Sequence, residues 1–281
     1  MKKIIMSAFA DEYSPELDIQ LKMLNENGIG YIEPRFLLGK NVADLTESEA
    51  REVKSKLSAS GICVSAIGSP LGKINLADNF DSHLEKTRRV LEVAKILDTD
   101  KVRMFSFYLR EGKTRDECRG EVIDKLGRMI DLAESYGVKL CHENEAAIYG
   151  ESPERCLDIL DTFGGKLRAV FDMGNFVLDG YRPFPDAYNT VKSYIEYFHI
   201  KDSLYAGAIV PPGCGEASIK EILTVHSECS DTPFIVTLEP HLETFDGLNS
   251  LVGKKFDNPY KFENKETAFL TAINKLKEIL K

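Results

Sequence analysis

The stretch VKLCHENEA (residues 138–146) begins like a buried β-strand and ends in a run of polar residues. Val138, Leu140 and Cys141 suit a dry interior, but His142 and the two glutamates after it do not. A carboxylate at the end of a buried strand costs free energy unless a partner compensates its charge. The stretch therefore indicates a strand whose end belongs to a site and not to the packed core.

Seven more β-rich runs occur along the chain, separated by longer segments with helical periodicity. In one such segment, apolar residues recur at the three- and four-residue spacing of a helix face, namely Val122, Leu126, Met129, Ile130 and Ala133. Strands that alternate with amphipathic helices form a parallel sheet covered by helices. The predicted strands comprise residues 3–9, 31–35, 62–68, 101–107, 139–144, 168–174, 195–201 and 233–239.

Eight strand–helix units in 281 residues are typical of a closed (β/α)8 barrel. The rival is an open doubly wound sheet, which normally carries G-x-G-x-x-G after its first strand. The stretch SAFADEY (residues 7–13) contains no glycine. We therefore predict an α/β fold with a single TIM-barrel domain over residues 1–281. Residues 240–262 lack a regular pattern and are expected to form a long loop at the barrel mouth, after the eighth strand.

The composition limits the classes of partner. The net charge is -9 at pH 7 and the pI about 5.2, so the chain lacks the basic field that attracts nucleic acid or anionic membranes. No stretch approaches the roughly 18 apolar residues of a membrane span. The six cysteines form no C-x-x-C pair, which is typical of reduced thiols in the cytoplasm. We expect a cytoplasmic protein without nucleic-acid or membrane partners; the sequence leaves a homo-oligomer open.

Four consecutive predicted strands end in a polar residue: Glu143, Asp172, His199 and Glu239. The active site of a (β/α)8 barrel lies at the carboxyl ends of its strands, so these side chains should converge at the mouth. Three carboxylates placed so close together repel one another, and a divalent cation is the natural compensation. Oxygen donors with one imidazole suit Mn²⁺ first, with Mg²⁺, Co²⁺ or Zn²⁺ as alternatives. The sequence therefore predicts one divalent metal ion held by these four residues.

With these motifs the chain resembles the xylose isomerase-like TIM-barrel superfamily, the sugar phosphate isomerase/epimerase group that also contains endonuclease IV. The resemblance covers essentially the whole chain and rests on HENE (142–145), FDMGN (171–175), FHIKD (198–202) and LEPH (238–241). It implies that the four strand-end residues hold one divalent metal ion. It also implies that Glu143 and Glu239 form an acid/base pair on opposite faces of a bound ketose.

Those residue types suit proton transfer beside a carbonyl. A cation on the carbonyl oxygen stabilises the enediolate, while one glutamate removes the proton and the other returns it. We therefore expect a metal-dependent isomerase or epimerase that acts on a small-molecule carbohydrate. A dehydratase or lyase acting on a keto-sugar or keto-inositol shares the first proton transfer and is the main alternative.

Two other function classes are disfavoured. An endonuclease IV-like phosphodiesterase needs three metal ions and many more histidines than the five in this chain. A binding or regulatory protein without catalysis would have no reason to keep carboxylates that repel one another at the barrel mouth.

Six further residues are predicted to contact the substrate: Glu33, Arg35, Lys73, Asn175, Lys201 and His241. For Glu33 and Arg35, an ion pair at the rim is an equal alternative. Asn175 stands where some epimerases of the resembled family carry a histidine, so their substrate contacts need not carry over. His142 alternates with Glu143 and is expected to point toward the helices. The pattern favours a neutral sugar, unless Arg35, Lys73 and Lys201 select a phosphorylated one.

Overall fold

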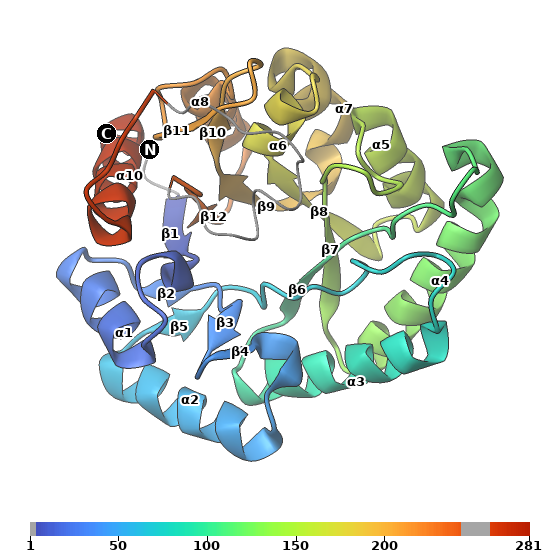
Figure 1. Ribbon diagram of the computed structural model, residues 1–281, viewed down its shortest axis with the longest axis horizontal. Coiled ribbons are helices and arrows are strands. Elements are labelled where there is room, and N and C mark those ends of the chain that lie inside the picture. Colours follow the sequence, from blue (N-terminus) through green and yellow to red (C-terminus); the bar gives the residue numbers. More distant parts are fainter. Residues whose placement is uncertain (1–3, 243–258) are drawn as a thin grey trace.

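In the computed structural model, which describes residues 4–242 and 259–281, the strands form a ring and the helices lie outside it (Figure 1). This arrangement confirms the predicted α/β barrel, and every predicted strand contains one barrel strand. The barrel strands are β1 (Ile4–Ala8), β2 (Tyr31–Ile32), β5 (Cys63–Val64), β6 (Lys101–Met104), β7 (Lys139–Glu143), β8 (Leu167–Asp172), β9 (Ile195–Ile200) and β12 (Phe234–Leu238).

Backbone hydrogen bonds close the ring, which excludes an open sheet. Parallel pairing runs in the order β1-β12-β9-β8-β7-β6, so the first strand lies beside the last, and β2 pairs with β5. The amide of Glu33 donates to the carbonyl of Ala8 at 3.0 Å and joins β2 to β1. The amide of Arg103 donates to the carbonyl of Ile67 at 2.9 Å and joins the segment after β5 to β6. The carboxyl ends of the strands therefore meet at one mouth.

The helices cover the outside of the ring, and the local sequence explains where several of them begin and end. Ser152 caps α5 by accepting a hydrogen bond from the amide of Arg155, with Pro153 in the first turn. Gly61 ends α2 in the left-handed conformation, with φ at 68°. The helices are α1 (Leu17–Glu26), α2 (Glu47–Ser60), α3 (Phe80–Ile96), α4 (Arg115–Ser135), α5 (Pro153–Thr162), α6 (Met173–Leu178), α7 (Tyr188–Val191), α8 (Ile219–Cys229) and α10 (Lys265–Leu280). None of the helices in the described residues could cross a membrane.

Several predicted strands are longer than the ladders that form; the strand predicted at 62–68 is reduced to Cys63–Val64 in β5. β2 ends at Ile32 and not at residue 35, because Pro34 has no amide hydrogen to donate to a ladder. β6 ends at Met104 and not at residue 107, because Phe107 has a φ of 68°, outside the strand region.

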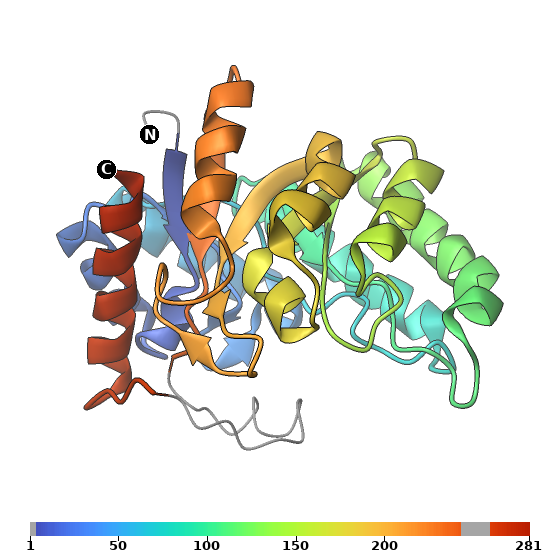
Figure 2. The same cartoon turned by 90° about the horizontal axis from the view of Figure 1, so that it is seen from above.

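Two small hairpins extend the strand–helix connections. They are β3 (Phe36–Leu37) with β4 (Lys40–Asn41), after β2, and β10 (Asp202–Ser203) with β11 (Ile209–Val210), after β9. Seen from the side, the β10–β11 hairpin lies at the same end of the barrel as helix α6 (Figure 2). The predicted loop at 240–262 falls mainly on residues 243–258, which lie outside the described residues.

A small apolar cluster fills the barrel interior beneath the strand ends. Side chains two positions apart on a strand share a face, so Glu143, Asp172 and His199 face inward, one step above members of this cluster. The cluster comprises Ala66, Cys141, Val170, Tyr197 and the partly buried Ile235.

Candidate active site

The four residues predicted as metal ligands converge at the barrel mouth. Glu143 and Asp172 are the last residues of β7 and β8, His199 lies in β9, and Glu239 directly follows β12. All four side chains are buried. One potential ligand atom from each lies within 4.8 Å of the others. We refer to these residues as the strand-end quartet.

His199 is at the centre of the quartet. Its Nδ1 lies 3.1 Å from Oε1 of Glu143 and 3.1 Å from Oε2 of Glu239. Its Nε2 lies 3.3 Å from both carboxylate oxygens of Glu33. Burial lowers the pKa of His199, but the charges on Glu143 and Glu33 outweigh burial and raise the pKa well above its ordinary value. One ring nitrogen therefore faces the quartet and the other is held by Glu33.

Glu33, predicted as a substrate contact, lies behind His199 instead. The residue is fully buried and is not part of the cavity lining. Its carboxylate accepts hydrogen bonds from the hydroxyl of Tyr197 at 2.9 Å and from that of Thr237 at 2.7 Å. These contacts hold the side chain inside the barrel, where it positions the His199 ring. In this arrangement Glu33 does not reach the cavity that the other predicted substrate contacts line.

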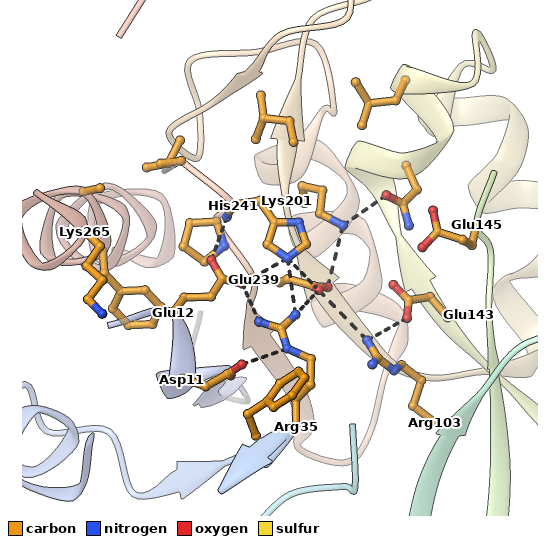
Figure 3. Close-up of a pocket in the computed structure, with 18 of the residues that line it drawn as sticks. Asp11, Glu12, Arg35, Arg103, Glu143, Glu145, Lys201, Glu239, His241 and Lys265 are labelled. Atoms are coloured by element: carbon orange, nitrogen blue, oxygen red, sulfur yellow. Dashed lines mark hydrogen bonds and ion pairs between the residues drawn. The ribbon is translucent and has the colours of Figure 1, made fainter. Parts of the chain in front are cut away.

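Three cations balance the three carboxylates of the quartet: Arg103 and Lys201 are buried, and Arg35 is partly exposed. Two of them are drawn with their partners in Figure 3. The cations come from three different places: the segment after β2, strand β6 and the residue directly after β9. Each carboxylate has its own donor: Arg103 donates to Glu143 at 3.1 Å, Arg35 to Glu239 at 3.0 Å and Lys201 to Asp172 at 2.9 Å.

These cations keep the two glutamates ionised. Burial raises the pKa of Glu143, but the charges on His199 and Arg103 outweigh burial and lower the pKa to about 2. For Glu239, the charges around it, led by Lys201, likewise outweigh burial and hold the pKa well below its usual range. Both carboxylates are therefore available as proton acceptors near neutral pH.

Asp172 is fixed by two asparagines. The side chain of Asn144 accepts from the amide of Asp172 at 3.0 Å and donates to its carbonyl at 2.9 Å. The amide of Asn175 donates to Oδ1 of Asp172 at 2.8 Å, which makes Asp172 the N-cap of α6. Burial raises the pKa of Asp172 to about 6, although the charge on Lys201 opposes the rise. Asp172 is thus the quartet carboxylate that takes up a proton most readily.

A cavity of about 670 Å³ opens above the quartet (Figure 3). Glu143 and Glu239 reach its wall, whereas Asp172 and His199 lie behind the wall. The other predicted substrate contacts do line this cavity: Arg35, Lys73, Asn175, Lys201 and His241.

Most of the charged residues of the cavity wall are paired with one another, and Lys265 of α10 also lines the cavity. Nε2 of His241 lies 3.2 Å from Glu12 and 3.2 Å from Glu239. Lys73 donates to Glu145 at 2.8 Å, and its ammonium group lies 4.2 Å from the centre of the Phe105 ring. Of the three cations considered for a phosphorylated substrate, each one therefore has a carboxylate partner within the protein.

Arg103 and Glu12 belong to this site although no sequence pattern predicted a role for them. Arg103 lies in strand β6 and is buried, with its guanidinium turned toward the quartet. The signal was a cation between the apolar residues Val102 and Met104, at a position that alternation places on the opposite face of the strand from both of them. Glu12 follows β1 in a short 3₁₀ helix (Ala10–Glu12), where alternation gives no direction.

The quartet fits a divalent cation. Three carboxylates and one imidazole form a hard donor set. Within the part of the chain that the structure describes, Oε2 of Glu239 is buried and accepts no hydrogen bond of good geometry, although Nδ1 of His199 lies 3.1 Å away. A second group, formed by Glu12, Glu239 and His241, is equally compact. The guanidinium of Arg35 already lies 3.0 Å from Glu239 and 3.3 Å from His241, so a cation is in place there.

This chain belongs to the xylose isomerase-like TIM barrel family, whose model matches residues 21–241. A sequence search of curated proteins gives no significant match.

Solved structures share the fold over nearly the whole chain. The IOLI protein with a bound zinc atom has a TM-score of 0.75 and 19% identity, covering 99% of this chain and 98% of that one. D-psicose 3-epimerase from Clostridium cellulolyticum H10, solved with D-tagatose, has a TM-score of 0.73, 14% identity and 98% coverage of both chains. The probable 3-DHS dehydratase AsbF from Bacillus anthracis has a TM-score of 0.71, 18% identity and 99% coverage of both. At these identities, the likeness establishes the shared fold.

Proposed function

We propose that this protein is a divalent metal-dependent isomerase or epimerase that moves a proton beside the carbonyl of a sugar or sugar derivative. The strand-end quartet carries the proposal, because its four buried ligand atoms lie within 4.8 Å of one another beside a cavity. Membership of the xylose isomerase-like family supports it, as does the similarity to an epimerase structure.

Glu143, Asp172, His199 and Glu239 would together hold one divalent ion. We propose Mn²⁺ first, with Mg²⁺, Co²⁺ or Zn²⁺ as alternatives, because the donors are mainly carboxylate oxygens. Among similar structures, one contains magnesium and another zinc. A bound ion supplies electrophilic stabilisation of the negative charge that develops on the substrate oxygen.

Glu143 and Glu239 are proposed as the acid/base pair. They reach the cavity from β7 and from the end of β12, and their lowered pKa values keep them ionised. Arg103 and Arg35 each hold one oxygen of these carboxylates, which fixes their orientation. One glutamate removes the proton beside the carbonyl, and the other returns a proton to the opposite face or to the next carbon.

The remaining cavity residues are proposed to bind the hydroxyl groups of the substrate. Lys201 and Asn175 hydrogen-bond each other at 3.0 Å and line the cavity beside Glu143. Lys73 and His241 also line this cavity. Because Arg35, Lys73 and Lys201 already have carboxylate partners, a phosphate would have to break an ion pair to bind. A neutral sugar is therefore favoured.

Lys201 favours a dehydratase or lyase as the second candidate. Its Nζ lies 2.9 Å from Asp172 and 3.7 Å from Glu239. Burial lowers the pKa of Lys201, but the charges on Asp172 and Glu239 outweigh burial and raise the pKa above its ordinary value. The raised pKa keeps the amine charged, so Lys201 would act on a leaving hydroxyl group as a hydrogen-bonding cation that stabilises the negative charge developing there. The similar structure of a probable dehydratase is consistent with this alternative.

The test combines metal analysis with isotope exchange. Wild type and Glu239→Gln are loaded with Mn²⁺, dialysed and analysed for metal, then incubated with a panel of ketoses in D₂O. Wild type should retain about one ion per chain and incorporate deuterium beside the carbonyl. The variant should lose most of its metal, and exchange should fall by about 10²- to 10⁴-fold.

Glu196→Gln is the matched control, because Glu196 lies in β9 but pairs with Lys139 and Arg168 outside the cavity. It should keep both metal and exchange. A wild type that binds no metal contradicts the proposal. Metal binding without exchange on any ketose, together with loss of water from a keto-sugar, would instead establish the lyase.

A further inference from the structure

The two arginines that pair with the proposed acid/base residues both reach Glu239 (Figure 3). Nη1 of Arg35 lies 3.0 Å from Oε1 of Glu239, and Nη1 of Arg103 lies 4.0 Å from the same oxygen. Arg103 also donates to Glu143 at 3.1 Å. Two guanidinium groups near one oxygen repel each other, so contacts beyond the glutamates must keep each of them in place.

One aromatic ring contacts both guanidinium groups. Phe9 directly follows β1 and is fully buried. The centre of its ring lies 4.6 Å from Cζ of Arg35 and 5.1 Å from Cζ of Arg103. A cation within about 6 Å of a ring centre is attracted to the negative π face, most strongly where water is excluded. Phe9 does not line the cavity, so its ring is a contact for the arginines and not for a substrate.

The same ring packs against the histidine of the quartet. The ring centres of Phe9 and His199 lie 5.1 Å apart, with the ring planes at 80°, which is the edge-to-face arrangement. Aromatic pairs prefer this arrangement to a face-to-face stack, so the contact favours one orientation of the two rings. Phe9 thus contacts one member of the quartet and both arginines that pair with its glutamates.

Gly68 leaves room for this ring. A Cβ atom at position 68 would lie 2.5 Å from Cε1 of Phe9, closer than Cβ atoms approach other atoms in proteins. The carbonyl of Gly68 accepts a hydrogen bond from Nη2 of Arg103 at 3.1 Å. Its amide donates to the carbonyl of Pro34, the residue before Arg35, at 3.0 Å. The missing side chain therefore lets Phe9 lie against the backbone that holds Arg103 and joins it to the segment of Arg35.

We infer that Phe9 is a positioning residue of the active site. Its ring holds the guanidinium groups of Arg35 and Arg103. These groups in turn keep Glu239 and Glu143 in fixed orientations at the cavity wall. The effect of the ring on proton transfer rests on the proposed function. Because Phe9 touches no substrate, loss of its π face should lower kcat and leave KM unchanged.

The experiment weakens the π face with and without removal of the ring. Residue 9 is replaced by 3,4,5-trifluorophenylalanine, whose fluorine atoms draw negative charge away from the face, and Phe9→Leu removes the ring. NMR spectra of arginine-labelled protein measure how fast each guanidinium group rotates about its Cζ–Nε bond. Rotation in both Arg35 and Arg103 should be at least about tenfold faster in Phe9→Leu. It should be intermediate with the fluorinated ring, which decides the matter if Phe9→Leu does not fold.

Deuterium exchange into a ketose supplies the second measurement, on the Mn²⁺-loaded full chain. Phe9→Leu should lower kcat about tenfold without changing KM, as is typical when a residue that orients a ligand or base is lost. The fluorinated ring should give an intermediate kcat. A residue that merely fills space would not respond to fluorine atoms at the ring edge, because the shape of the ring is almost unchanged.

Position 234 is the matched control, because Phe234 is a buried ring at the start of β12 that packs against Phe198 and His226. The same two replacements there should leave the rotation rates and kcat unchanged. Unchanged rotation in the variants at position 9, or faster rotation with unchanged kcat, would overturn the inference. A wild type without exchange on any ketose contradicts the proposed function alone, because the rotation rates still report whether the ring holds the arginines.

Discussion

Two histidines of this barrel are equally buried, yet their surroundings shift their pKa values in opposite directions. His199 faces the interior among carboxylates, and its pKa is raised. His142 faces the helices, hydrogen-bonds the hydroxyl of Ser106 at 3.0 Å, and burial lowers its pKa to about 3. His199 belongs to a charged region inside the barrel mouth, which we call the ionic interior. His142 belongs to an uncharged buried layer between the barrel and the helices, which we call the neutral layer. Burial disfavours the charged form of a histidine, and the charges on neighbouring carboxylates determine whether its pKa is nevertheless raised.

Removing a cation from the ionic interior should have the largest effect. Arg103→Met leaves Glu143 buried without its 3.1 Å partner, so the free energy of unfolding should fall by about 3–5 kcal/mol. The pKa of Glu143 should also rise, because the charge on Arg103 lowers it. Urea denaturation measures the first effect, and Mn²⁺ affinity between pH 4 and pH 7 reports the second. Arg128→Met, which breaks an exposed pair with Asp81, should cost less than about 1 kcal/mol.

The neutral layer should respond to acid. His83 of α3 accepts a hydrogen bond from the amide of Gly72 at 2.9 Å, and burial lowers its pKa from 6.5 to about 4. Below pH 6.5, His83 binds a proton in the unfolded chain but not in the folded one. The contribution of His83 to the free energy of unfolding is therefore fully present above pH 6.5 and is lost as the pH falls toward 4. In His83→Gln, the loss of stability between pH 7.5 and pH 5 should shrink by about 2 kcal/mol. An unchanged pH dependence would show that this layer tolerates charge.

The smallest effect is expected behind the quartet, at Glu33. Glu33→Gln keeps a hydrogen-bonding side chain behind His199 but removes the charge that holds its ring. Metal affinity should fall about tenfold, as is typical for residues that orient a ligand. Calorimetric Mn²⁺ titration tests this expectation, and Co²⁺ absorption spectra should show altered coordination. An unchanged affinity and spectrum would contradict a positioning role for Glu33.

The ionic interior was predictable from sequence where a polar residue ends a long apolar strand. Glu143 and Asp172 have that context, and alternation along β7 also predicted that His142 points outward. Glu33 was assigned to the correct strand end, but its contact with His199 was not foreseen. The relative positions of side chains from different strands along the barrel axis depend on the stagger between those strands. This stagger cannot be predicted from the sequence of one strand. Sequence alone does not predict a role for Arg103, because a cation inside a strand fits the ordinary alternation of that strand.

The pairing of Arg35, Arg103 and Lys201 with the three quartet carboxylates has a consequence for the order in which this protein is assembled. In a zinc finger, metal binding supplies the folding free energy, so synthesis and loading are one event. Here the charges are balanced as the chain folds, and folding need not wait for an ion. Under the proposed function, an ion would enter a finished protein, in competition with the ammonium group of Lys201 for Asp172. Which metal is acquired then depends on the supply at that moment.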